Sequence, residues 1–382
     1  MTDLSDFFEI IQQHYERGLP FVAYRKSFDD RTGKEEQPGL LKALLQHDDR
    51  VFRVRDFSER GFVFSPFDQR KDTLLIPYTE SRKMFAVLPV KPKTDAPDKA
   101  SDIQDCPEQE ARELHLQLVR KGVEAIRHGK LKKVVLSRTE EIRIDGEKPI
   151  AVFRRLLEHY PDAFCYIWYH PVTGLWLGAT PETLLHIKGC VLHTMALAGT
   201  QKFRGTTKVD WGEKEKQEQQ VVTDAIVDSL RFRVNSLKIS AAETHRAGNL
   251  LHIKTDIQAS LIDGYKKENI ASLLNSLHPT PAVCGFPKEE AKRFILENEG
   301  YDRSFYSGFL GELHTAIVPA TEGASDNTDS ALYVNLRCMQ LGAHTASLYI
   351  GGGITRDSDP KSEWEETCHK AQTMKKILLR KP

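Results

Sequence analysis

Apolar residues recur at the spacing of an amphipathic helix in several segments of the chain. The clearest segment runs from about Glu108 to His128, and its apolar positions follow helical spacing. Segment 212–234 predicts a long helix whose first half is charged and whose second half is apolar. Pro287 favours the first turn of a further helix, because the first turn does not use the backbone N–H that proline lacks. The same periodicity predicts helices over 1–18 and 362–379.

Other segments show the short apolar or β-branched runs that are typical of strands. Residues 132–138 form one such run, and residues 164–170 and 174–180 flank a turn and predict a hairpin. Segments 332–341 and 345–350 predict a second hairpin, which leads into three consecutive glycines. Strands outnumber β–α–β units and hairpins dominate. This pattern favours an α+β fold with large antiparallel sheets over a doubly wound parallel sheet.

The sequence indicates the domain boundaries of the chain less clearly than its helices and strands. With 382 residues it is long enough for one large domain or two small ones. Residues 1–87 carry no motif that predicts chemistry. Segment 88–110 is rich in Pro, Asp and Lys, which predicts an exposed connection.

Composition excludes several classes of function. The chain has 54 basic and 54 acidic residues, so its zero net charge gives no whole-molecule attraction to nucleic acid or to an anionic membrane. No apolar run approaches the ~20 residues of a membrane helix, and the acidic start of the sequence is unlike a secretory signal. The six cysteines are irregularly spaced without a CxxC pair, which argues against a zinc site or a disulfide framework. We therefore expect a cytoplasmic protein.

Two predicted helices carry carboxylates three residues apart, hence on one face. These are Glu215 with Glu218, and Glu363 with Glu366, which Lys370 follows one turn later. Two glutamates on each of two helices could enclose Mg²⁺, a hard cation that takes oxygen ligands. A solvated charged face explains the same spacing, and for segment 213–218 alone it is the more frequent explanation. The spacing by itself leaves both open.

Further residues allow either a structural or a chemical role. Gly351, Gly352 and Gly353 would let backbone amides approach an anion closely, although a tight bend explains them equally well. Arg337 is expected in the middle of a strand, where a guanidinium needs an anionic partner. That partner could be a structural carboxylate or a carboxylate substrate. Lys133 precedes an apolar run and could be an ordinary lysine at the start of an edge strand.

Taken together, nine segments resemble the chorismate-utilising enzymes, which comprise isochorismate, salicylate, anthranilate and aminodeoxychorismate synthases. They follow the order of that family over about residues 130–375, whereas residues 1–105 match only loosely. The resemblance implies a single domain over 1–382 with its catalytic motifs in 106–382, and antiparallel sheets packed together with helices outside, as in anthranilate synthase component I. The matching segments are KKVVLSR (132–138), GATPETLL (178–185), ALAGT (196–200), EKEKQEQQVV (213–222), LHPTPAVCGFP (277–287), YDRSFYSGFLGEL (301–313), VNLRCMQL (334–341), YIGGGI (349–354) and SEWEET (362–367).

The resemblance also implies roles for individual residues in a reaction of chorismate, a small dicarboxylate. Lys133 would activate water, and Glu182 would protonate the departing 4-hydroxyl group. Burial suits both roles, because it lowers the pKa of a lysine and raises that of a glutamate. Mg²⁺ on Glu218 and Glu366 would hold the ring carboxylate, and Arg337 would hold the pyruvyl carboxylate. The other implied residues are Glu215 and Glu363 near the metal, and Gly199, Thr200, His252, Gly351, Gly352, Gly353 and Lys370 around the substrate.

Three places separate the members of this family. Lys133 stands where anthranilate synthases have glutamine, and Ala198 stands where aminodeoxychorismate synthases have a nucleophilic lysine. Segment 278–281, HPTP, is similar to isochorismate synthases. Segment 212–218, GEKEKQE, departs from the commoner SEKDRHE but retains Glu218.

We therefore expect an isochorismate synthase, an isomerase of the hydroxymutase type that acts on chorismate with Mg²⁺. Salicylate synthase is the alternative, and a carboxylate-binding regulator on the same scaffold is the non-enzymatic one. The product would supply menaquinone biosynthesis or, as an alternative, a catechol siderophore. We expect a monomer with no nucleic acid, membrane or obligate protein partner.

Overall fold

The computed structural model describes residues 1–27, 39–89, 109–144, 146–262, 270–316 and 328–379. Most of the connection predicted over 88–110 lies outside the described residues. The helices are α1 (Leu4–Glu16), α2 (Gln109–Arg127), α3 (Pro149–His159), α4 (Glu213–Leu230), α5 (Ile270–Leu277), α6 (Lys288–Asn298) and α7 (Pro360–Leu379). The strands are β1 (Phe21–Arg25), β2 (Leu40–Gln46), β3 (Phe52–Arg53), β4 (Gly61–Ser65), β5 (Leu74–Pro77), β6 (Ser81–Val87), β7 (Lys133–Arg143), β8 (Phe164–His170), β9 (Gly174–Thr180), β10 (Thr183–Lys188), β11 (Val191–Lys202), β12 (Val234–Ile239), β13 (Glu243–Ala247), β14 (Leu250–Leu261), β15 (Gly285–Phe286), β16 (Phe309–Ala316), β17 (Thr328–Val334), β18 (Cys338–Leu341) and β19 (Thr345–Ile354).

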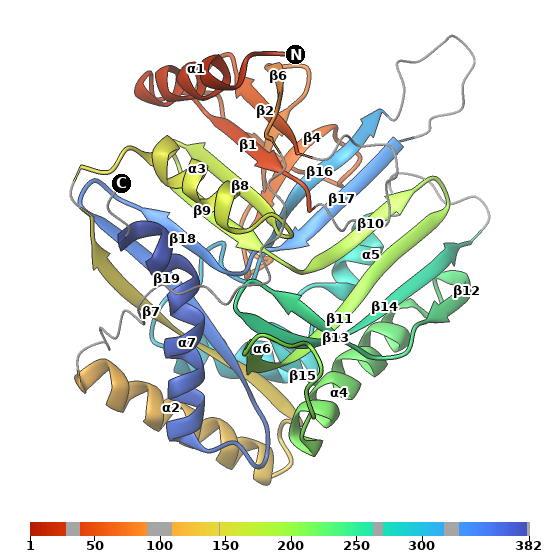
Figure 1. The fold of residues 1–382 in the computed structure, drawn as a ribbon. Coiled ribbons are helices and arrows are strands. Elements are labelled where there is room, and N and C mark those ends of the chain that lie inside the picture. Colours follow the sequence, from red (N-terminus) through yellow and green to blue (C-terminus); the bar gives the residue numbers. More distant parts are fainter. Residues whose placement is uncertain (28–38, 90–108, 145, 263–269, 317–327, 380–382) are drawn as a thin grey trace.

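Among the described residues, the strands form two antiparallel sheets of nine and ten strands (Figure 1). The order in the first sheet is β15-β7-β19-β18-β9-β8-β1-β2-β6. The order in the second is β12-β14-β11-β10-β17-β16-β4-β5-β3, and β13 also pairs with β14. Residues 1–87 complete both sheets, because β1, β2 and β6 extend the first and β3, β4 and β5 extend the second.

The two sheets pack face to face around aromatic side chains. Phe164 of the first sheet stacks on Tyr333 of the second, with ring centroids 4.0 Å apart. Trp168 of the first sheet lies 5.1 Å from Phe64 of the second, again between ring centroids. Strand β8 is therefore buried on both faces, which explains why its sequence is a continuous apolar run instead of an alternating one.

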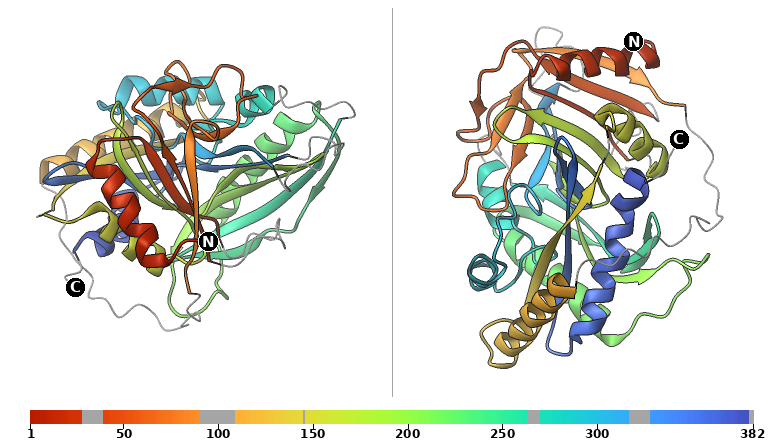
Figure 2. Two further views of the ribbon diagram at one scale, coloured as in Figure 1. Left: turned by 90° about the horizontal axis from the view of Figure 1, so that it is seen from above. Right: turned by 90° about the vertical axis from the view of Figure 1, so that its left-hand side faces the viewer.

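Helices cover the outer faces of this sandwich. Helices α1, α3 and α7 pack on the outer face of the first sheet, and α4 and α5 pack on that of the second. The right-hand view in Figure 2 shows α7 (blue) running along the side of the first sheet. This arrangement confirms the predicted α+β fold with antiparallel sheets inside and helices outside. No helix among the described residues is long and apolar enough to cross a membrane.

The long helix predicted over 212–234 ends earlier than expected. Helix α4 ends at Leu230, and Val234 already begins β12, which pairs with β14 through Val234 and Leu261. At this end the backbone hydrogen bonds that residues from Val234 onward form with β14 outweigh their helix propensity.

The prediction of one continuous strand through Arg337 is wrong. Strand β17 ends at Val334 in the second sheet, and β18 begins at Cys338 in the first. The chain crosses from one sheet to the other between them, and Arg337 takes a left-handed backbone conformation with φ 47°. Local periodicity predicted one continuous strand because it carries no information about which sheet each half joins.

Candidate active site

Two crossings of the chain between the sheets lie side by side and carry two predicted site residues. The chain leaves β9 in the first sheet and reaches β10 in the second through Pro181 and Glu182. It returns between β17 and β18 through Arg337. The backbone N–H of Val334 donates to the carbonyl of Glu182 over 3.0 Å, which ties the two crossings together.

Glu182 is buried at this seam, with 2% of its surface exposed. Burial raises the pKa of its carboxyl group to about 8, and the neighbouring Lys133, Thr280 and Arg337 oppose this rise without cancelling it. The carboxyl group therefore carries its proton at neutral pH, which is the state required of a general acid.

Lys133 is not an exposed lysine on an edge strand. It begins β7, which pairs with β19 on one side and with β15 on the other, where Phe286 faces Lys133. Its side chain is 1% exposed, and its Nζ lies 2.9 Å from Oε1 of Glu218. The geometry of this ion pair falls short of a hydrogen bond. The structure thus places a lysine and a protonated glutamate in one buried neighbourhood.

Arg337, His252 and Gly199 form a chain of contacts beside Glu182. Nη2 of Arg337 lies 2.6 Å from Nε2 of His252, and Nδ1 of His252 lies 2.8 Å from the carbonyl oxygen of Gly199. A guanidinium only donates, so Nε2 accepts, and the ring proton on Nδ1 is donated to Gly199. Burial, with Arg337 nearby, lowers the pKa of His252 well below its usual value, in agreement with a neutral ring. The hydroxyl of Thr200 lies 3.5 Å from the same Nδ1.

The three glycines lie within β19 and do not form a bend. Gly351, Gly352 and Gly353 pair with residues 137, 136 and 135 of β7. A Cβ at Gly353 would collide with Oε1 of Glu218, and one at Gly351 would lie 2.6 Å from the hydroxyl of Tyr306. Glycine inside a strand thus leaves room for side chains from other elements to approach the backbone.

Three of the four predicted metal ligands approach these glycines. We call Glu218, Glu363 and Glu366 the glutamate trio. A Cβ at Gly352 would lie 3.6 Å from Oε2 of Glu363 and 3.8 Å from Oε1 of Glu366. Burial and the charge of Glu366 raise the pKa of Glu363. Among the described residues no group of three or more His, Cys, Asp or Glu side chains is assembled as a metal site.

Glu215 turns away from the glutamate trio. Its Oε2 lies against Gly212, the residue before the first turn of α4, at 2.6 Å from the position of a Cβ there. This is the direction in which a glutamate three residues after a helix N-cap reaches back to that cap. The structure therefore separates Glu215 from the ligands with which the sequence grouped it.

A cavity of about 100 Å³ connects most of the predicted residues. Of the predicted set, its walls include Glu182, Gly199, Thr200, Glu218, His252, Arg337, Gly351, Gly353, Glu366 and Lys370. Nζ of Lys370 donates to the carbonyl of Gly351 over 2.9 Å and pairs with Oε1 of Glu366 over 2.7 Å. The walls also include Tyr306, Tyr349 and Met374, to which the sequence assigned no role. Tyr306 and Tyr349 lie in segments that resemble the family, but nothing in the local pattern marked these side chains, and Met374 lies outside those segments.

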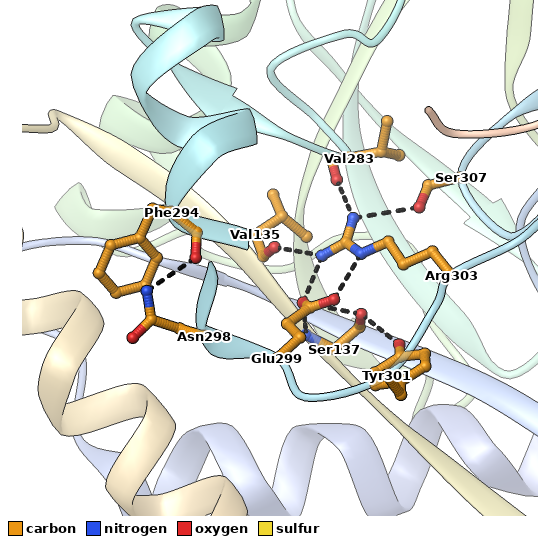
Figure 3. Close-up of polar contacts among 9 residues, drawn as sticks. All are labelled: Val135, Ser137, Val283, Phe294, Asn298, Glu299, Tyr301, Arg303 and Ser307. Carbon is orange, nitrogen blue, oxygen red and sulfur yellow. Dashed lines mark hydrogen bonds and ion pairs between the residues drawn. The ribbon is translucent and has the colours of Figure 1, made fainter. Parts of the chain in front are cut away.

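A buried network behind this cavity holds its walls together (Figure 3). The guanidinium of Arg303 donates to both carboxylate oxygens of Glu299, at 2.5 and 2.7 Å. It also donates to the carbonyl oxygens of Val135 over 2.7 Å and Val283 over 2.9 Å. Ser137 donates its backbone N–H and its hydroxyl to Glu299 over 2.7 and 2.9 Å. We call these residues the Arg303 network; it was not predicted from the sequence.

The comparison with protein families identifies the class of this protein. The model of the chorismate binding enzyme family matches residues 63–379, so the chain belongs to this family. The salicylate biosynthesis isochorismate synthase of Pseudomonas aeruginosa is 33% identical over 283 residues, covering 72% of this chain and 56% of that protein. The isochorismate synthase MenF of Escherichia coli is 29% identical over 276 residues, covering 69% and 59%. The chain thus spans little more than half the length of these relatives.

Solved structures extend the likeness of the fold to nearly the whole chain. The structure of MenF, the menaquinone-specific isochorismate synthase of Escherichia coli, matches with a TM-score of 0.69 at 20% identity, over 98% of this chain and 99% of that one. Anthranilate synthase component I of Streptococcus pneumoniae matches with a TM-score of 0.65 at 18% identity, over 92% and 95%. Since proteins with different names share this fold, the reaction has to be argued from the site.

Proposed function

We propose that this protein is an isochorismate synthase, which adds water at C2 of chorismate and removes the 4-hydroxyl group in a Mg²⁺-dependent reaction. The observation that carries this proposal is the buried Glu182, whose pKa is raised to about 8 beside Lys133 and Arg337. A leaving hydroxyl group needs a proton, and a carboxyl group that is protonated at neutral pH can supply it. The relatives named above support the same reaction.

Lys133 is the proposed base that removes a proton from the attacking water. Its side chain is buried and lies in the neighbourhood of Glu182, so that a substrate ring between them would meet a base and an acid. Anthranilate formation would instead need ammonia as the nucleophile. An amine in place of the glutamine of anthranilate synthases supports water as the attacking group.

Arg337 is the proposed partner of the pyruvyl carboxylate. None of the described carboxylates forms an ion pair with Arg337, whose guanidinium contacts the carbonyl of Ala247 over 3.0 Å and the neutral His252. A half-buried guanidinium without a carboxylate partner among the described residues is suited to bind a carboxylate ligand. Of the two partners that the sequence left open, this favours the substrate.

The glutamate trio is suited in chemistry to hold Mg²⁺. Glu218 and Glu366 line the cavity, and Oε2 of Glu363 is buried without a hydrogen-bond partner among the described residues. Burial and the neighbouring charge of Glu366 raise the pKa of Glu363, and a hard divalent cation with oxygen ligands would stabilise its charged form. When bound, the ion would neutralise the ring carboxylate of the substrate. Glu215 is the least suited member of the predicted set, because it faces Gly212.

We further propose that the enzyme acts as a single chain in the cytoplasm and supplies menaquinone biosynthesis. The likeness to MenF in sequence and in fold supports this pathway. The Pseudomonas relative is named for salicylate biosynthesis, which keeps salicylate synthesis as the second candidate. A catechol siderophore remains the other destination of the product.

Product analysis tests the proposal. The purified protein is incubated with chorismate and Mg²⁺, with and without ammonium, and the products are separated by chromatography. We expect isochorismate, and no dependence on ammonium. Anthranilate or 4-amino-4-deoxychorismate in the ammonium sample would contradict the proposal, and salicylate with released pyruvate would support the second candidate.

A further inference from the structure

Each member of the glutamate trio pairs with a different lysine. Glu218 lies 2.9 Å from Nζ of Lys133, and Glu366 lies 2.7 Å from Nζ of Lys370. Glu363 lies 2.6 Å from Nζ of Lys214. With all three lysines protonated, these pairs are formally neutral in the substrate-free protein without any metal ion. Lys133 can act as the base only after it has released this proton.

The side chain of Lys214 is held by fewer contacts than those of the other two lysines, so it can move away from its glutamate more easily. Lys133 is enclosed, and Lys370 is held by the carbonyl of Gly351 as well as by Glu366. The side chain of Lys214 is 33% exposed, and Glu363 is the one ion-pair partner that the described residues give it. It stands on the first turn of α4, and its ion pair with Glu363 joins the starts of α4 and α7.

The charge of Lys214 acts on the whole trio. Lys214 contacts Glu363 directly, Glu218 stands four residues after Lys214 on one face of α4, and Glu366 stands three residues after Glu363 on one face of α7. The ammonium group therefore lies on the side of the two helices that carries the three carboxylates. An ammonium group that attracts three carboxylates must also repel a divalent cation among them. By the same argument it attracts an anionic substrate in the adjoining cavity.

We propose that Lys214 is a resident counter-cation of the glutamate trio, which weakens the binding of Mg²⁺ to the substrate-free enzyme and strengthens the binding of the dicarboxylate substrate. Mg²⁺ added to the neutral cluster leaves two positive charges uncompensated, and a dicarboxylate offsets them. The metal ion is therefore bound mainly together with the substrate. The inference rests on the proposed function for the identity of the metal ion and of the substrate.

Two titrations of the Lys214→Gln variant test this inference, because they should move in opposite directions. Titration calorimetry with MgCl₂ at constant ionic strength, without chorismate, should show Mg²⁺ binding that is about 3- to 10-fold tighter than in the wild type. Titration with chorismate in the presence of EDTA, where no turnover occurs, should show binding that is about 2- to 5-fold weaker.

Lys216→Gln is the matched control on the same helix. Lys216 pairs with the exposed Glu213 over 2.9 Å and lies away from the trio, so its loss should change neither affinity. The thermal unfolding temperatures of both variants in EDTA show whether they are folded. A purely structural role of Lys214 predicts that both ligands bind more weakly.

The inference is overturned if Lys214→Gln binds Mg²⁺ no more tightly than the wild type in the absence of chorismate, or if it binds chorismate in EDTA no more weakly than the wild type. These titrations do not depend on product formation. If the two affinities shifted in opposite directions but no isochorismate formed, the inference about Lys214 would stand and the proposed function would be contradicted.

Discussion

Two ion-pair clusters contact β7, one at Lys133 and the other at Val135 and Ser137, and they differ in how completely their polar atoms are bonded. In the Arg303 network, Glu299 and Arg303 satisfy one another and two backbone carbonyls, with side-chain exposures of 1% and 2%. In the glutamate trio, Oε2 of Glu363 lacks a hydrogen bond among the described residues, and the pKa of Glu363 is raised by burial and by Glu366.

The difference separates a cluster that supports the fold from one that is prepared for ligands. A satisfied network fixes the position of what it touches, here the cavity walls at Val135 and Val283. A cluster with unsatisfied polar atoms reduces the stability of the ligand-free protein, and binding of a cation and an anion offsets this loss. Substitutions in the first should therefore reduce stability, and substitutions in the second should reduce activity.

The largest effect is expected for Lys133→Gln, within the neighbourhood of the trio. The glutamine side chain is one atom shorter than that of lysine and keeps a hydrogen-bond donor, but it cannot take a proton from water. A general base contributes about 10²–10⁴-fold, so kcat should fall by this factor while KM changes little. Steady-state kinetics on the folded variant measure this. A rate within about tenfold of the wild type would show that Lys133 is not the base.

A pair of matched substitutions tests the comparison itself. Glu299→Gln removes the charge that compensates the buried Arg303, and breaking a buried pair costs about 3–5 kcal/mol in the free energy of unfolding. Glu363→Gln also removes a charge, but it relieves repulsion with Glu366 and leaves Lys214 in contact with water. We expect its stability to stay within about 1 kcal/mol of the wild type.

Denaturant unfolding gives the stability of Glu299→Gln and Glu363→Gln, and turnover at increasing Mg²⁺ concentrations gives their response to the metal ion. Glu363→Gln should lose the response of turnover to Mg²⁺ while remaining folded. Equal losses of stability in the two variants would remove the distinction between the clusters.

The pH dependence gives a smaller effect that is specific to Glu182. Its carboxyl pKa is raised from 4.5 to about 8, so the folded protein keeps a proton that the unfolded chain releases between these pH values. Stability should fall as pH rises across this window and level off above it, by no more than about 5 kcal/mol from this group. The general acid is also lost there, so kcat should fall about tenfold per pH unit above pH 8.

The Glu182→Gln variant is the control for both measurements. Its free energy of unfolding should not show the decrease that Glu182 causes as the pH rises to about 8. Its residual kcat should not fall above pH 8. A wild-type rate that stays level from pH 7 to 10 would contradict an acid role for Glu182.

The sequence predicted the elements better than it predicted their junctions. Alternating and helical periods are local, and they located the start of β7, the β8–β9 hairpin and α7 to within two residues, whereas β7 continues five residues beyond its predicted end. The crossing at Arg337 depends on strand partners far away in the sequence, so the local pattern missed it.

The same limit applies to the candidate site. The segments that resemble the family pointed to Glu182, Glu218, Glu366 and Arg337, and the structure places these four side chains around one cavity. Their roles stay predictions. Lys214 and the Arg303 network were not foreseen, because a charged residue on a helix or after a turn shows its role only through partners from other segments.

Isotope labelling tests the central claim, that water from solution attacks C2 while the 4-hydroxyl group leaves. The wild type is incubated with chorismate and Mg²⁺ in ¹⁸O-labelled water, and isochorismate is collected early, before the reverse reaction contributes. Mass spectrometry with fragment analysis then locates the label. We predict one ¹⁸O atom in the C2 hydroxyl group of each product molecule. Unlabelled isochorismate would mean that the hydroxyl group is transferred within the substrate and would contradict the roles proposed for Lys133 and Glu182.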